Sequence, residues 1–276
     1  MSIAQPMRTT ECQHLGFRLS CFDYSSIIPH LVRRLQRLAL LNSPLRIEDA
    51  TIRNVLQTVL QTIMNNCAEV RMGNVQHNNA KHAVLFEAIS LAIHLDTNSP
   101  LVADAAVLLA RFIQSKETNV RYLGLDTLAH LAARADTLAP IKRHQTTILM
   151  SLRDKDISVR RRALDLLYSM CDTENSELIV GELLRYLRSA DYALREEMVL
   201  KIAILTEKYA NSYKWYVDMI LQLISSAGEH VGDEVWYRVV QIVTNTEDLQ
   251  EYAARAVFEH LKSPATHESL IKVGGM

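Results

Sequence analysis

Three clusters of histidine, arginine and acidic residues are the parts of this sequence whose side chains could do chemistry. His77, His82 and His94 fall in one stretch that we expect to be helical, and imidazole is a common metal ligand. Their spacings of five and twelve residues do not put all three on one face of a helix, so we expect no metal site. The run Arg160–Arg162 resembles a short patch for phosphate or nucleic acid. We favour a structural role for Arg160 and solvated side chains for its two neighbours.

The segment Asp154-Lys155-Asp156 holds two carboxylates that could act as an acid and a base. Three charged residues in a row fit a solvated turn between helices better. The sequence contains no phosphate-binding loop, dinucleotide-binding glycine motif, zinc-protease motif, nucleophile elbow or CxxC pair. We therefore expect no catalytic residue, no metal, no cofactor and no enzymatic activity.

Two aromatic pairs, Trp215-Tyr216 and Trp236-Tyr237, lie in successive expected helices. Such a pair could form a platform for a ligand, but we favour packing between repeats, because large aromatic side chains usually bury much of their surface. The cysteines have no metal-like spacing with one another or with histidine, which fits reduced thiols in a cytosolic protein; they are Cys12, Cys21, Cys67 and Cys171.

The elements that position these side chains are expected to be helices. Hydrophobic residues make up 49% of the 276 residues and aromatic residues only 6%, so most of the apolar area comes from aliphatic side chains suited to helix packing. Only 6 Pro and 8 Gly are present, fewer than a sheet-rich chain with many tight turns would need. The composition favours an all-α protein.

The formal net charge is −1, which argues against a nucleic-acid-binding protein, since such proteins usually carry a basic excess. Charge is nevertheless uneven, with a local excess of +4 over Lys116–Met170 and of −4 over Cys171–Leu200. This asymmetry could steer a partner chain, but solvated helix faces are the simpler interpretation. We find no apolar run of the ~20 residues needed to cross a bilayer and no signal peptide, so any membrane contact is expected to be peripheral.

Apolar residues recur at steps of three and four along successive stretches, which predicts amphipathic helices. Between residues 157 and 170 the stripe is Val159, Ala163, Leu166, Leu167 and Met170; between 194 and 209 it is Leu194, Met198, Ile202, Leu205 and Tyr209. Short breaks separate the helices, at Ser99-Pro100, Ala139-Pro140 and Ser263-Pro264, with Gly228 expected to close another helix.

A repeated pattern, acid-x-x-aliphatic-Arg, opens several of these helices. The copies are Glu117 to Arg121, Asp156 to Arg160 and Asp191 to Arg195, with a looser fourth copy from Asp233 to Arg238. The arginines lie 39, 35 and 43 residues apart, close to the period of HEAT and armadillo repeats. We therefore predict a right-handed α-solenoid of helical pairs.

The residue types of this pattern suggest what it does. An acid at a helix start accepts hydrogen bonds from free backbone N–H groups, and an arginine four residues later lies on the same face and can pair with it. The arginine can also reach the adjoining repeat. We expect a structural ladder, formed by Glu117, Arg121, Asp156, Arg160, Asp191, Arg195 and Arg238.

The two ends of the chain look uncapped. Counted from the ladder, residues 248–261 would be the first helix of a new pair, with its partner starting near His267, and the other end opens on an unpaired helix at 26–41. Solenoids normally end in polar capping repeats. We therefore expect an internal segment of a longer array, truncated at both ends and stopping mid-repeat.

Several stretches resemble the trunk of the alpha-type adaptins, large subunits of the plasma-membrane clathrin adaptor. They are residues 74–91, 117–125, 159–172, 191–205, 207–210, 215–218, 234–238 and 270–275. The sequences Tyr-Ala-Leu-Arg-Glu-Glu from residue 192 and Glu-Val-Trp-Tyr-Arg from residue 234 favour the alpha type over gamma, delta and epsilon adaptins. The resemblance covers residues 24–275.

The resemblance implies a non-catalytic scaffold in clathrin-dependent endocytosis and vesicle-mediated protein transport. Its implied partners are a beta-type large chain, a medium chain and a small chain, and its implied location is the cytosolic face of the plasma membrane. The competing hypothesis is a generic HEAT-repeat regulatory scaffold unrelated to coats.

Residues 1–22 do not resemble the family, and we expect them to be a poorly ordered segment before a repeat array at 23–276. The lipid and cargo sites of the family lie in a more N-terminal part of the trunk, and its clathrin-binding linker and appendage lie beyond the C-terminus. We therefore assign no lipid, cargo or clathrin residue in this chain.

Overall fold

The computed structural model describes residues 50–68, 75–96, 99–134, 138–262 and 267–275, and the regular elements in these ranges are all helical. The α-helices are α2 (Ala50–Ala68), α3 (Val75–Leu95), α4 (Pro100–Ile113), α5 (Thr118–Arg134), α6 (Ala139–Lys142), α7 (Gln145–Ser151), α8 (Ile157–Met170), α9 (Ser176–Leu187), α10 (Tyr192–Tyr209), α11 (Tyr213–Ala227), α12 (Asp233–Asn245), α13 (Glu247–Leu261) and α14 (Glu268–Gly274). A short 3₁₀ helix, η2 (Gly228–His230), follows α11. The prediction of an all-α repeat array is confirmed. The predicted segments 1–22 and 26–41, and the break at Ser263-Pro264, lie outside the described residues.

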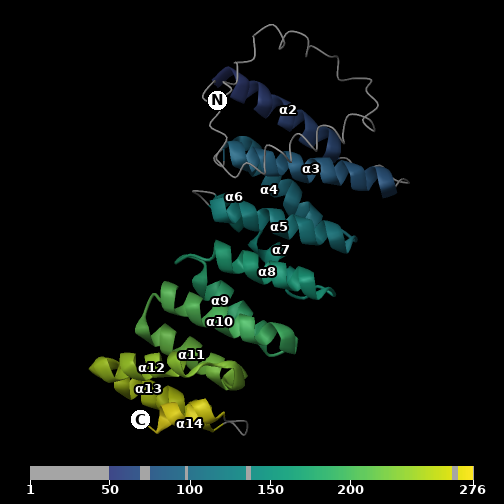
Figure 1. The fold of residues 1–276 in the computed structure, drawn as a ribbon. Helices are drawn as coiled ribbons and strands as arrows, with labels where there is room; N and C mark the ends of the chain where they lie inside the picture. Colours follow the sequence, from purple (N-terminus) through teal and green to yellow (C-terminus); the bar gives the residue numbers. More distant parts are fainter. Residues whose placement is uncertain (1–49, 69–74, 97–98, 135–137, 263–266, 276) are drawn as a thin grey trace, which may run out of the picture.

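The helices form two rows that run the length of the molecule, which Figure 1 shows as one elongated stack. In the first row α3 contacts α5, α5 contacts α8, α8 contacts α10, and α12 contacts α14. In the second row α2 contacts α4, α4 contacts α7, α9 contacts α11, and α11 contacts α13. Helices of the two rows also contact each other in pairs, such as α9 with α10. This is the arrangement of a helical-pair solenoid.

The pairing at the C-terminal end differs from the prediction by one helix. We expected residues 248–261 to open a pair, but α13 packs on α11 and so belongs to the second row, while α14 packs on α12 in the first. The fourth copy of the acid-to-arginine pattern opens α12, and that copy marks the first helix of the pair. Helices paired from the fourth copy, Asp233 to Arg238, would have placed α12 first and α13 second in their pair, as the structure does.

The predicted apolar stripes form the core between the rows. Val159, Ala163, Leu166, Leu167 and Met170 of α8 are fully buried. Of the α10 stripe, Leu194, Met198, Ile202 and Leu205 are buried, whereas Tyr209 is half-buried at the end of the helix. Each helix therefore places its three-and-four-spaced apolar side chains between its neighbours, as amphipathic packing requires.

Two of the predicted helix starts have clear local causes. The backbone N–H of Leu101 donates to the hydroxyl of Ser99 at 3.2 Å, and Pro100 occupies the first turn of α4, where a missing N–H costs nothing. Pro140 plays the same part in α6, which ends after one turn.

Gly228 follows the end of α11 as predicted, but for a different reason. Its φ of −56° is not left-handed, so no special backbone conformation requires glycine there. A Cβ at this position would instead lie 2.6 Å from the Cβ of His267. The close approach of the segment that starts α14 is what excludes a side chain.

Substitution of Gly228 by alanine is expected to lower the free energy of unfolding by about 1–3 kcal/mol, because the added methyl group must displace the backbone near His267. Gly181→Ala is the matched control, since a Cβ at Gly181 meets nothing within 4 Å. Alanine there should stabilise helix α9 by up to about 1 kcal/mol. Urea unfolding followed by circular dichroism measures the change in free energy of unfolding for both variants. Equal changes for the two substitutions would contradict the close contact between position 228 and His267.

Candidate functional site

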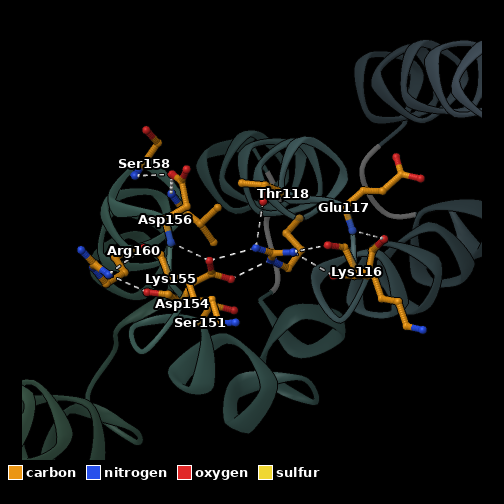
Figure 2. Close-up of polar contacts among 12 residues, drawn as sticks. Lys116, Glu117, Thr118, Ser151, Asp154, Lys155, Asp156, Ser158 and Arg160 are labelled. Atoms are coloured by element: carbon orange, nitrogen blue, oxygen red, sulfur yellow. Dashed lines mark hydrogen bonds and ion pairs between the residues drawn. The ribbon is translucent and has the colours of Figure 1, made fainter.

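Arg121, in the first turn of α5, connects the turns that precede α5 and α8, and Figure 2 labels Lys116 and Asp154 in these two turns. Its Nε donates to one carboxylate oxygen of Asp154 at 2.6 Å and its Nη2 to the other at 3.0 Å. Its Nη1 donates to the backbone carbonyls of Ser115 and Lys116, both at 3.0 Å. The guanidinium therefore donates hydrogen bonds to the turn that precedes its own helix and also binds the carboxylate in the corresponding turn of the next repeat.

Arg160 repeats this arrangement one repeat further along the chain. Its Nη1 donates to the carbonyl of Asp154 at 2.6 Å and to that of Lys155 at 3.3 Å (Figure 2). Its Nη2 forms an ion pair with Asp191, which begins α10. The carbonyls that these arginines reach belong to the loops just after α4 and α7, where a helix supplies no backbone donor for them.

The two later arginines follow the pattern less closely. Arg195 donates from Nε to the carbonyl of Ala190 at 3.1 Å, and its Nη1 lies 3.8 Å from Glu229. Arg238 reaches back instead of forward, since its Nε lies 3.2 Å from Glu207 of the preceding repeat. We call Arg121, Arg160, Arg195 and Arg238 with their acidic partners the arginine ladder.

The acids of the repeated pattern do not share one role. Asp156 caps α8, accepting from the N–H groups of Ser158 at 2.8 Å and Val159 at 3.4 Å. Asp191 stands at the N-cap of α10, yet makes no capping hydrogen bond and pairs with Arg160. Glu117 is not the partner of Arg121. The expected pairing of acid and arginine within one copy is thus replaced by pairing between successive repeats.

Asp154 is the ladder residue that sequence reasoning missed, because it was assigned to a solvated turn. Its carboxylate side chain is only 11% exposed. The signal that could have found it is distance along the chain: Arg121 and Arg160 meet acids 33 and 31 residues further on, roughly one repeat. The pair Asp154 and Asp156 accordingly forms no acid–base centre, since one carboxylate is held by arginine and the other caps a helix.

Burial by itself would raise the pKa of the Asp154 carboxyl group. Hydrogen bonds from Arg121 and from the backbone N–H of Asp156, with the positive charges of Arg121 and Arg160, outweigh burial and lower that pKa below its ordinary value of 3.8. The ionised carboxylate is therefore the form that stabilises the fold.

The free energy of unfolding is expected to fall as the pH drops below about 4, because protonation breaks the pair of Asp154 with Arg121. The pKa of Asp154 is lower in the folded chain than its ordinary 3.8. The contribution of Asp154 to the free energy of unfolding is therefore complete above the pKa that its carboxyl group has in the unfolded chain. It is lost as the pH falls through the lower pKa that this group has in the folded chain. Urea unfolding between pH 7 and pH 3 measures this loss, and Asp154→Asn should make it smaller; an unchanged pH dependence in that variant would contradict the assignment.

We expected the two arginines beside Arg160 to be solvated; the side chain of Arg161 is 53% exposed and that of Arg162 is 36% exposed, and both also have acidic partners. The Nε of Arg161 lies 3.3 Å from Glu197. Arg162 pairs with Asp126 at 3.1 Å and donates to the hydroxyl of Tyr122. The run thus has partners within the chain, which leaves little of it for phosphate or nucleic acid.

The histidines and aromatic pairs lie apart from the ladder. His82 is buried edge-on against Phe112, with ring centroids 5.1 Å apart, and His94 Nδ1 lies 2.7 Å from the carbonyl of Ser90. His77 belongs to α3, like these two. Within the described residues, no group of three or more histidine, cysteine or acidic side chains could hold a metal ion.

The two tryptophan–tyrosine pairs are arranged differently from each other. Tyr216 is buried in the core while Trp215 is only half-buried. Trp236 is buried and stacks on the exposed Tyr237, with ring centroids 3.9 Å apart. Packing thus accounts for Tyr216 and Trp236, as expected, but leaves part of Trp215 accessible. None of the described helices is long and apolar enough to span a bilayer.

Two rows of paired helices, with a recurrent arginine at the turns between pairs, define a helical-repeat protein of the solenoid class. More specifically, the chain belongs to the adaptin family, since residues 22–275 match the family described as Adaptin N terminal region. The hypothesis of a repeat protein unrelated to coats is therefore wrong.

Individual relatives agree with this assignment. The chain is 54% identical over 229 residues to the AP-2 complex subunit alpha-2 of Dictyostelium discoideum, covering 83% of this chain and 23% of that protein. It is 52% identical over 227 residues to the AP-2 complex subunit alpha-1 of Arabidopsis thaliana, covering 82% of this chain and 22% of that protein. The AP-1 complex subunit gamma of Dictyostelium discoideum is 35% identical over 207 residues, with coverages of 75% and 23%. The predicted resemblance to the alpha type is confirmed, and the chain spans less than a quarter of the length of these relatives.

Proposed function

We propose that this chain is a non-catalytic scaffold segment of a clathrin-adaptor large subunit, acting in clathrin-dependent endocytosis and vesicle-mediated intracellular protein transport. The observation that carries the proposal is the identity of 54% to an AP-2 alpha subunit, against 35% to a gamma subunit of the same organism. Its partners would be a beta-type large chain, a medium chain and a small chain. It would reach the cytosolic face of the plasma membrane peripherally, within the assembled complex.

The physical character of the chain supports a scaffold. The ladder arginines and the core side chains are engaged in holding one helical pair against the next, as at Arg121 and Asp154. A stack of this kind presents a long surface to partners without requiring a reaction centre. The arginine ladder would serve this function by fixing the angle between repeats, and so the spacing of the surfaces that partners contact.

Co-expression of this chain with the beta, medium and small adaptor subunits tests the proposal. Affinity purification through a tag on this chain is expected to retain at least one of the three, and circular dichroism should show the chain to be helical. An unrelated helical-repeat chain of similar length, carrying the same tag, is the control. A folded chain that retains none of the three subunits would contradict the proposal.

A further inference from the structure

His82 is a titratable side chain that is buried where α3 packs against α4. The residue is only 8% exposed, and among the residues that the structure describes neither ring nitrogen has a hydrogen-bond partner. Most buried polar groups in proteins are hydrogen-bonded, so a buried ring with neither nitrogen satisfied is unusual. The fold therefore packs His82 as it would pack an apolar side chain.

The ring of His82 belongs to a small aromatic cluster. It lies edge-on against Phe112 of α4, with the ring centroids 5.1 Å apart, and the ring of Phe86, one turn further along α3, lies 5.5 Å from that of Phe112. Gly124 of α5 backs this cluster, since a Cβ at that position would lie 3.4 Å from the Cβ of Phe112. Phe112 is therefore held between α3 and α5 and has little room to move away from His82.

Protonation of His82 would add a positive charge and a second N–H donor to this site, where the described residues offer the ring no acceptor. Burial is the largest effect on the ring, and it lowers the pKa of His82 below the ordinary value of 6.5; the negative charge of Glu117, just before α5, opposes this lowering. No other ionisable group of α2, α4 or α5 adds a charge effect at the ring, including Cys67, Asp104, Arg111 and Arg121. The neutral imidazole is the form that fits the folded chain.

Separation of α3 from α4 would bring the ring of His82 into water, where its pKa returns toward 6.5. The open form therefore binds a proton more readily than the closed form, and a falling pH favours opening. The contribution of the neutral ring to the closed form is complete above pH 6.5 and is lost as the pH falls from there through the lower pKa of the folded chain. Opening would uncover Leu85 and Ile89 of α3 and Leu109 of α4, which are fully buried.

We propose that His82 is a proton-sensitive contact, which opens the packing of α3 on α4 at mildly acidic pH while the helices from α8 onward stay closed. Helical pairs in a repeat array contact only their neighbours, so a local opening need not spread along the stack. The range concerned, from about pH 7 to about pH 5.5, lies above the pH at which Asp154 loses its charge, so the two effects are separable. The proposal concerns the chain on its own and does not depend on assembly with adaptor subunits.

Hydrogen exchange of the whole chain at about pH 7.5 and about pH 5.5 tests this, once the rates are corrected for the pH dependence of the chemical exchange step. Opening of α3 and α4 is expected to become several-fold more frequent at the lower pH, up to about tenfold, because the open form gains a proton with a pKa near 6.5. Helices α8 and α10 contain no histidine, and their exchange should change less than about twofold.

Three variants assign the effect to His82. His82→Leu replaces the ring by an apolar side chain of similar size, and His82→Gln replaces it by a polar one that does not titrate in this range; each should abolish the pH dependence in α3 and α4. His130→Gln is the matched control, since the side chain of His130 on α5 is 72% exposed, and it should keep the full pH dependence. A rise in opening below about twofold in the unmodified chain, or a rise that persists in either folded His82 variant, would overturn the proposal.

Carbon-13 NMR of the unmodified chain with labelled histidine rings gives a direct readout that does not depend on the stability of a variant. The histidine ring signal that His82→Gln or His82→Leu removes belongs to His82. It is expected to titrate with a midpoint below 6.5, and a midpoint at or above 6.5 would overturn the proposal.

Discussion

Replacing Arg121 by alanine is expected to lower the free energy of unfolding by about 3 kcal/mol, because it leaves the largely buried carboxylate of Asp154 without its partner. The two side chains are only 15% and 11% exposed, so water does not replace the lost hydrogen bonds well. The carbonyls of Ser115 and Lys116 lose their donor at the same time. The loss should therefore exceed that of an ordinary surface ion pair several-fold.

Urea unfolding of Arg121→Ala, Asp154→Ala and the double variant measures this as a double-mutant cycle. The double variant should be destabilised by less than the sum of the single variants, because the second substitution removes a charge that the first left unpaired. Arg153→Ala is the matched control, since Arg153 is exposed, and it should change stability by no more than about 0.5 kcal/mol. A loss below about 1 kcal/mol for Arg121→Ala would mean that the ladder contributes no more than a surface contact.

Replacing Leu167 by alanine is expected to cost about 2–5 kcal/mol, because the side chain is fully buried in the stripe of α8 and its removal leaves a cavity between repeats. Leu200→Ala is the control, since Leu200 on α10 is 58% exposed. That substitution should stay within about 0.5 kcal/mol.

Hydrogen exchange on the Leu167→Ala variant should show where the stability is lost. In a repeat array each helical pair contacts only its neighbours, so exchange is expected to become faster in α8 and in α5 and α10, which both contact α8, than in α13 or α14. Uniform loss of protection along the whole chain would contradict the description of the fold as a stack of locally stabilised pairs.

The helices were predictable from the sequence because their signals are local. The stripe from Val159 to Met170 predicted a helix at 157–170, and α8 spans Ile157–Met170. Ser99 and Pro100 marked the start of α4 by a capping side chain and a preset backbone angle. Each of these signals acts within a few residues, so it can be read without knowing the tertiary structure.

The partners of the arginines were not predictable in the same way. Spacing of four residues suggested that Arg121 pairs with Glu117, but a guanidinium at a helix start can also reach the turn of the next repeat, where Asp154 lies. Which acid pairs with the guanidinium depends on how the repeats pack against each other.

A chimeric large subunit gives the most direct test of the adaptor role. In it, residues 50–275 of this chain replace the matching segment of the Dictyostelium discoideum AP-2 alpha-2 subunit, to which the chain is 54% identical. We expect the tagged chimera, expressed in those cells in place of the natural subunit, to co-purify with the other subunits of the complex as the unaltered subunit does. A chimera that is helical and expressed at a normal level, yet is purified without those subunits, would contradict it.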